Sequence, residues 1–109
     1  MATIFGTLLI RNEGNGYLTS VYLEHSETRP NVENCIRQGD SGSDDPFTGV
    51  FDTSWLEPGA QRAVLTISRQ PGVVYDLKWG RISNAGYVYK GRAILTEGKL
   101  VGCYWQEAG

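Results

Sequence analysis

The chain has 109 residues, of which 40% are hydrophobic and 20% are charged, and its formal net charge is −2. This balance excludes a disordered tail, and the slight acidity argues against a nucleic-acid partner, which usually requires a basic excess. The apolar stretch near the start is too short to span a membrane and lacks the basic flank of a signal peptide. We therefore expect one domain over residues 1–109, cytoplasmic, with no membrane and no nucleic-acid partner.

The first predicted element is a β-hairpin, because two strand-like runs flank a polar, glycine-rich turn. Its strands cover residues 4–11 and 17–24. Residues 25–46 have no helical period, although residues 32–38 fit either a short strand or a helical turn. The strand pattern resumes at residues 47–55.

Two further hairpins follow along the chain. One joins residues 62–69 to 73–79 around Gln70-Pro71-Gly72, and the other joins residues 87–95 to 99–105 around Glu97-Gly98. No segment of ten or more residues shows the spacing of an amphipathic helix. The pattern is therefore that of an all-β protein.

Most of these strands alternate between an apolar face and a polar face, as the wall of a barrel or a sandwich requires. Tyr75, Leu77 and Trp79 share one face of their strand, for example, while Asp76 and Lys78 share the other. Glycines in mid-strand permit the sharp bending that small barrels need. We predict a small antiparallel β-barrel of six to eight strands connected as a meander, with a β-sandwich as the alternative.

The run from residue 47 to residue 105 resembles small meander barrels of the avidin and lipocalin type, the calycin-like proteins. The resemblance rests on the placement of glycines and aromatic residues in FTGVFDTSW, AVLTISRQPGVVYDLKW and YVYKGRAILTEGKLVGCYW. It implies a barrel fold and a role in binding a small ligand. Those families begin with the entry strand that lies here at residue 47, so residues 1–46 fall outside the resemblance. No biotin-site residue carries over.

Several motifs suggest chemistry but lack the partners that the chemistry needs. The GDSGS at residues 39–43 resembles the nucleophile segment of trypsin-like proteases, yet His25 is the only histidine in a chain too short for that fold. Asp40, Asp44 and Asp45 do not have the spacing of an EF-hand calcium loop. We therefore predict no catalytic residue, no metal site and no cofactor.

The two cysteines, Cys35 and Cys103, form no metal-binding motif, and the interior of a barrel this size does not need a disulfide. We expect both thiols to be free. Lys78, Lys90 and Arg92 lie on polar faces and could form a basic patch, but the acidic balance of the chain argues against a nucleic-acid site there.

The heavy aromatic load leads to the functional hypothesis. Large rings fill a barrel core, but tryptophans at strand ends also suit the rim of a pocket. We expect a non-enzymatic binding protein that holds a small apolar or aromatic ligand in the barrel mouth. The alternatives are a homodimeric protein-interaction module and a small isomerase-like or cyclase-like enzyme. The expected ligand-binding residues are Trp55, Tyr75, Trp79, Tyr87, Tyr89 and Trp105.

The strand register gives the most specific expectation. In a meander, residues 73–79 and 99–105 run in the same direction on either side of residues 87–95. Trp79 and Trp105 should then lie at one end of the barrel, clustered around Tyr87. This interpretation places Val101, Cys103 and Trp105 on the inward face of the last strand.

Overall fold

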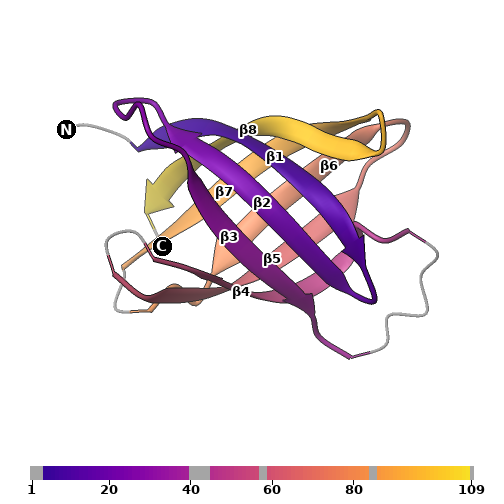
Figure 1. Cartoon of the computed structure of the whole chain (residues 1–109), viewed down its shortest axis with the longest axis horizontal. Coiled ribbons are helices and arrows are strands. Elements are labelled where there is room, and N and C mark those ends of the chain that lie inside the picture. Colours follow the sequence, from indigo (N-terminus) through magenta and orange to yellow (C-terminus); the bar gives the residue numbers. More distant parts are fainter. Residues whose placement is uncertain (1–3, 40–44, 57–58, 84–85, 109) are drawn as a thin grey trace.

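The computed structural model describes residues 4–39, 45–56, 59–83 and 86–108. Each strand pairs antiparallel with the next along the chain, and the last pairs with the first, which closes a barrel (Figure 1). The described residues contain no helix, so residues 32–38 contribute a strand and no helical turn. The predicted meander barrel is confirmed and the sandwich alternative is wrong. The strands are β1 (Phe5–Gly14), β2 (Tyr17–Glu24), β3 (Asn31–Arg37), β4 (Gly49–Trp55), β5 (Gln61–Arg69), β6 (Val74–Gly80), β7 (Tyr87–Thr96) and β8 (Lys99–Ala108).

The core lies inside the barrel because alternate side chains of each strand point inward. The apolar face predicted for β6 is confirmed as the inward face by the burial of Tyr75, Leu77 and Trp79. The inward face predicted for β8 is wrong. Leu100 and Tyr104 are buried inside, whereas the side chains of Val101 and Cys103 are exposed. The core residues are Leu8, Ile10, Leu18, Cys35, Phe47, Phe51, Ala63, Leu65, Ile67, Tyr75, Leu77, Trp79, Ile82, Ala93, Leu100 and Tyr104.

Gly102 explains the reversed face of β8. It pairs with Leu8 of β1 and with Ala93 of β7, between the inward positions of Leu100 and Tyr104. A Cβ atom on Gly102 would lie 2.0 Å from the carbonyl oxygen of Arg92 and 2.6 Å from the Cα atom of Ala93. The inward face of β8 therefore needs a residue without a side chain at its centre, which hides that face from a search for apolar alternation.

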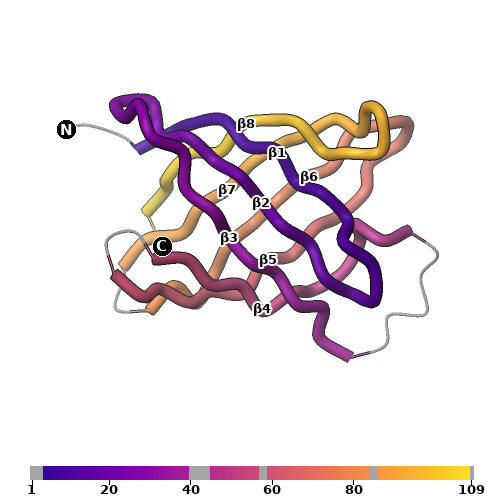
Figure 2. Tube along the Cα trace, in the orientation of Figure 1, coloured from indigo at the N-terminus to yellow at the C-terminus, as the bar shows by residue number. Residues whose placement is uncertain are grey.

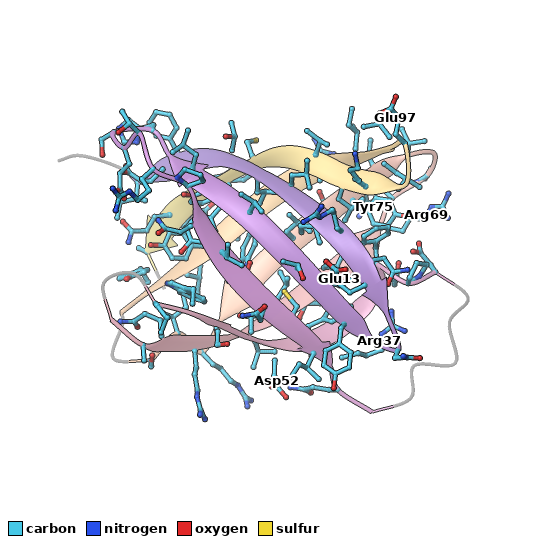
Figure 3. All side chains as sticks on the ribbon, in the orientation of Figure 1. Glu13, Arg37, Asp52, Arg69, Tyr75 and Glu97 are labelled. Carbon is cyan, nitrogen blue, oxygen red and sulfur yellow. The ribbon has the colours of Figure 1, made fainter. Side chains whose placement is uncertain are left out.

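One end of the barrel is plugged by residues 45–48, which precede β4. Phe47 is buried there and packs edge-to-face on Tyr75, with ring centroids 6.3 Å apart. The Tyr75 hydroxyl donates a 2.7 Å hydrogen bond to Asp45 Oδ2, and the Phe47 amide donates a 2.9 Å bond to Asp45 Oδ1. Figure 3 places Tyr75, Arg37 and Arg69 at this end. Arg37 Nη2 holds the plug by donating to backbone carbonyl oxygens of Asp45, Pro46 and Thr48, at 3.2, 2.8 and 2.9 Å.

The opposite end carries the start of β1, the end of β8 and the connections β2–β3, β4–β5 and β6–β7 (Figure 2). We call it the open end, because an aromatic-lined cavity of the barrel opens there. The hairpin turns β1–β2, β5–β6 and β7–β8 all lie at the plugged end. Among the described parts of the structure, the open end is therefore the entrance that a ligand would use.

Both cysteines are free thiols, as predicted. Cys35 is buried inside the barrel and Cys103 is exposed on the outer wall. Burial raises the pKa of the Cys35 thiol, and the negative charge of Glu33 raises it further. Cys35 therefore stays protonated at neutral pH and serves as a small apolar core residue.

Candidate ligand-binding cavity

The open end contains a cavity of about 560 Å³. This volume lies within the range of roughly 300–1,000 Å³ that is typical of small-molecule sites. All strands but β5 contribute to its wall, as does the β2–β3 connection. Its lining residues are Ile4, Leu8, Ser20, Tyr22, Glu24, His25, Ser26, Glu27, Asn31, Glu33, Trp55, Trp79, Tyr87, Tyr89 and Tyr104.

Five aromatic side chains form a connected group in this wall, which we call the aromatic cluster: Tyr22, Trp79, Tyr87, Tyr89 and Tyr104. Tyr104 is its centre, with ring centroids 5.9 Å from Tyr22, 6.0 Å from Tyr89 and 6.4 Å from Trp79. Tyr89 also lies 5.4 Å from Tyr87. All four pairs are edge-to-face, the arrangement that the quadrupoles of aromatic rings favour. The cluster therefore holds its own geometry without a ligand.

Glu33 is the unexpected member of the cavity wall. It is only 3% exposed, and its carboxyl group lies inside the barrel on β3. The indole Nε1 of Trp79 donates a 2.7 Å hydrogen bond to Glu33 Oε2. Ser20 pairs with Glu33 across β2 and β3, and its buried side chain lies close enough to the carboxyl group to affect the Glu33 pKa. A buried carboxyl group is rare in proteins unless it is paired, so Glu33 is a candidate functional residue of this cavity.

Burial raises the pKa of Glu33 from 4.5 to about 7, because the charged form loses its hydration inside the barrel. Hydrogen bonding with Trp79, Thr53 and Ser20 opposes this effect without cancelling it. Among the described residues, no lysine or arginine forms an ion pair with Glu33. Glu33 therefore holds its proton to a higher pH than an exposed glutamate does, inside an aromatic cavity.

The cavity is electrically negative. Besides Glu33, the lining includes Glu24 and Glu27 at the mouth, and no lysine or arginine is among the described lining residues. The pKa of the Tyr104 hydroxyl is raised in this environment. Burial raises its pKa to about 12, and the charges of Glu24, Glu27 and Glu33 all act in the same direction. His25 closes one side of the mouth, stacked on Phe5 with ring centroids 3.9 Å apart.

The structure brings four of the six residues expected to bind ligand into this cavity, namely Trp55, Trp79, Tyr87 and Tyr89. Tyr75 is 1% exposed and lies at the plugged end, bonded to Asp45. Trp105 lies at the open end, as predicted, but on the outer wall of β8, where its Nε1 donates to the exposed Glu107. The expected cluster of Trp79, Tyr87 and Trp105 is therefore wrong in its third member.

Tyr104 takes the place that was expected of Trp105, because the inward face of β8 contains Tyr104. Glu33, Tyr22 and Ser20 also line the cavity and were not expected there from the sequence. Glu33 was not predicted to face inward, because it is charged. The apolar residues Val32 and Ile36 lie on the opposite face of the same strand. Both of these neighbours are 50% exposed on the outer wall. The usual relation between apolarity and burial is reversed at Val32, Glu33 and Ile36 of β3.

The other sequence-based candidates contribute no competing site in the described structure. Residues 40–44, with most of the GDSGS motif and with Asp40 and Asp44, lie outside the described residues, while Asp45 belongs to the plug. In the described ranges, no group of three His, Cys, Asp or Glu residues is placed to hold a metal ion. Those ranges also contain no helix long and apolar enough to cross a membrane.

Two of the three cations that were considered for a basic patch belong to ion pairs. Arg92 Nε lies 3.0 Å from Asp76 Oδ1, and Lys90 Nζ lies 3.3 Å from Glu107 Oε1. Both pairs are solvent-exposed, so neither contributes much to stability. They partly neutralise the positive charge on the outer wall of β6 and β7.

Comparison of this chain with protein-family models, with curated proteins and with solved structures finds no match.

Proposed function

We propose that this protein is a non-enzymatic binding protein that holds a small, largely aromatic or apolar ligand in the open end of its barrel. The observation that carries the proposal is the 560 Å³ cavity, walled by the aromatic cluster and Trp55 and plugged at its far end. Pockets that bind small molecules are mostly apolar and contain a few fixed polar groups. Glu33 and Ser20 supply such groups here.

Preorganisation supports the same function. The rings of the aromatic cluster already contact one another edge-to-face, and the Trp79 indole is fixed by its hydrogen bond to Glu33. A ligand would therefore enter without first having to order these side chains, which lowers the entropic cost of binding. The plug at the opposite end leaves the open end as the entrance.

A fluorescence titration tests this proposal with N-phenyl-1-naphthylamine, an uncharged aromatic dye that brightens in apolar surroundings. We expect saturable binding with one dye per chain. Asn31→Trp places an indole in the mouth, because Asn31 lines the cavity. It should weaken dye binding at least tenfold. Val32→Trp is the matched control, since Val32 is the next residue and is 50% exposed on the outer wall.

The control variant should bind the dye as the wild-type protein does. Dye binding that Asn31→Trp and Val32→Trp affect equally would place the site elsewhere on the surface. Absence of saturable binding to the wild-type protein would contradict the proposal.

One observation favours an enzyme as the second candidate. A carboxyl group with a pKa of about 7 inside a cavity is suited to general acid–base catalysis near neutral pH. In such an enzyme Glu33 would move a proton on a bound carbon acid, as an isomerase requires. The base-sensitive probe 5-nitrobenzisoxazole tests this capacity. Ring opening that depends on Glu33, saturates with probe and rises through pH 7 would favour the enzyme.

A further inference from the structure

The cavity contains a buried acidic group, Glu33, for which the described residues supply no counter-charge. Trp79 Nε1 donates one neutral hydrogen bond to Glu33 Oε2. None of the four ion pairs in the described structure involves Glu33. Ionisation of such a group is costly unless a positive charge reaches it. A ligand that carries a positive charge would supply this counter-charge to Glu33.

The surroundings of Glu33 suit a cation as well. Trp79 and Tyr104 both line the cavity, and aromatic faces attract ammonium groups within about 6 Å by an interaction that strengthens when water is excluded. Glu24 and Glu27 place further negative charge at the mouth. The described wall has no lysine or arginine that would repel a cation or attract an anion.

From these contacts we propose that the ligand is an organic cation, an ammonium group on an aromatic or apolar body, with the ammonium held by Glu33 between Trp79 and Tyr104. This inference rests on the proposed function and names the chemical class of its ligand. The aromatic body would lie against the rest of the aromatic cluster, and Glu24 and Glu27 would attract the cation towards the mouth.

The proposal has a consequence for pH. Besides Glu33, the titratable groups that face the cavity are Glu24 on β2, His25 and Glu27 on the β2–β3 connection, and four tyrosines. Only Glu33 is both fully buried and shifted to a pKa of about 7. A cation bound beside it should favour the ionised carboxylate and release protons at neutral pH. The tyrosines are Tyr22, Tyr87, Tyr89 and Tyr104.

Three indoles of nearly equal shape test the proposal by isothermal titration calorimetry. Tryptamine ends in an ammonium group, 3-propylindole ends in a methyl group and indole-3-propionate ends in a carboxylate. At pH 8 we expect tryptamine to bind at least tenfold more tightly than 3-propylindole, and indole-3-propionate to bind most weakly. Between pH 8 and pH 6 tryptamine should weaken about tenfold, because the ionised, binding-competent fraction of Glu33 falls by that factor.

Glu33→Gln is the informative variant, because glutamine keeps an oxygen that can accept the Trp79 Nε1–H bond while the charge is removed. It should abolish the preference for tryptamine and its pH dependence but leave the affinity for 3-propylindole within about threefold. Glu107→Gln, on the exposed outer wall, is the control and should change none of these affinities.

The outcomes separate the two proposals. If 3-propylindole binds as tightly as tryptamine, the cation inference is overturned while the binding function stands. If Glu33→Gln binds tryptamine as the wild-type protein does, Glu33 is not the counter-ion and the inference is again overturned. If neither the indoles nor N-phenyl-1-naphthylamine bind, both proposals fall.

Discussion

The Trp79 indole donates a 2.7 Å hydrogen bond to the Glu33 carboxyl group across the interior of the barrel. Trp79 lies on β6 and Glu33 lies on β3, two strands that are not neighbours in the sheet. The bond therefore links opposite walls of the barrel at the floor of the cavity. It fixes the indole and lowers the pKa of the carboxyl group, against the larger effect of burial, which raises it.

Glu33 should make the protein less stable as the pH rises. The folded state holds the Glu33 proton more tightly than the unfolded state, with a pKa of about 7 against 4.5. Its contribution to the free energy of unfolding is therefore greatest below pH 4.5, falls between pH 4.5 and 7, and is constant above that. The total loss is roughly 3 kcal/mol.

Urea denaturation of the wild-type protein and of Glu33→Gln at pH 5 and pH 8 measures this effect, since subtraction cancels the other titrating groups. From pH 5 to pH 8, the free energy of unfolding of Glu33→Gln should rise relative to that of the wild-type protein. A stability difference that does not change with pH would contradict the burial of an ionisable carboxyl group.

Trp79→Phe should lower the free energy of unfolding by about 2–4 kcal/mol at pH 8, because it removes buried ring atoms and leaves the Glu33 carboxylate without its donor. The loss should be smaller at pH 5, where Glu33 is protonated. Trp105→Phe is the matched control, because the Trp105 indole donates only to the exposed Glu107. It should cost less than about 0.5 kcal/mol. Thermal unfolding curves compare the two variants, and equal losses would refute the assigned roles.

Tyr75→Phe tests the plug, because it removes the hydroxyl that donates to Asp45. We expect a loss of about 1–2 kcal/mol at pH 7. Partial burial opposes ionisation of Asp45, but hydrogen bonds from the Phe47 amide, Tyr75 and Thr48 outweigh it and lower the Asp45 pKa. The loss should therefore shrink in acid, as Asp45 becomes protonated. Tyr17→Phe, at a tyrosine that is 50% exposed, should be nearly neutral in the same denaturation series.

Gly102→Ala should prevent the barrel from closing normally, because the added Cβ atom would meet backbone atoms of Arg92 and Ala93. Backbone cannot move aside as a flexible side chain can, so the cost should be at least about 3 kcal/mol. A Cβ atom on Gly80 would have no neighbour within 4 Å, so Gly80→Ala should change stability by no more than about 1 kcal/mol. Circular dichroism during chemical denaturation measures both, and a stable Gly102→Ala protein would contradict the register of β7, β8 and β1.

The hairpins could be predicted from the sequence because their turns and alternating faces are local signals. The inward face of β8 could not be predicted, because both of its faces contain apolar residues. The correct face contains Gly102, which is needed there because the backbone of β7 lies so close. Glu33 could not be found either. Its burial depends on a hydrogen bond from Trp79, 46 residues away, while the apolar Val32 and Ile36 beside it face solvent. The pocket residues on strands that alternate clearly between apolar and polar residues could therefore be predicted, whereas the buried carboxyl group of Glu33 could not.

The three tryptophan indole N–H groups give the most direct test of the binding site by nuclear magnetic resonance. Trp55 and Trp79 line the cavity, whereas Trp105 lies on the outer wall at the same end of the barrel. Titration of the ¹⁵N-labelled protein with N-phenyl-1-naphthylamine should shift the indole resonances of Trp55 and Trp79, with the Trp105 resonance unchanged. Shifts confined to Trp105, or no indole shift at saturating dye, would contradict a ligand site in the open end of the barrel.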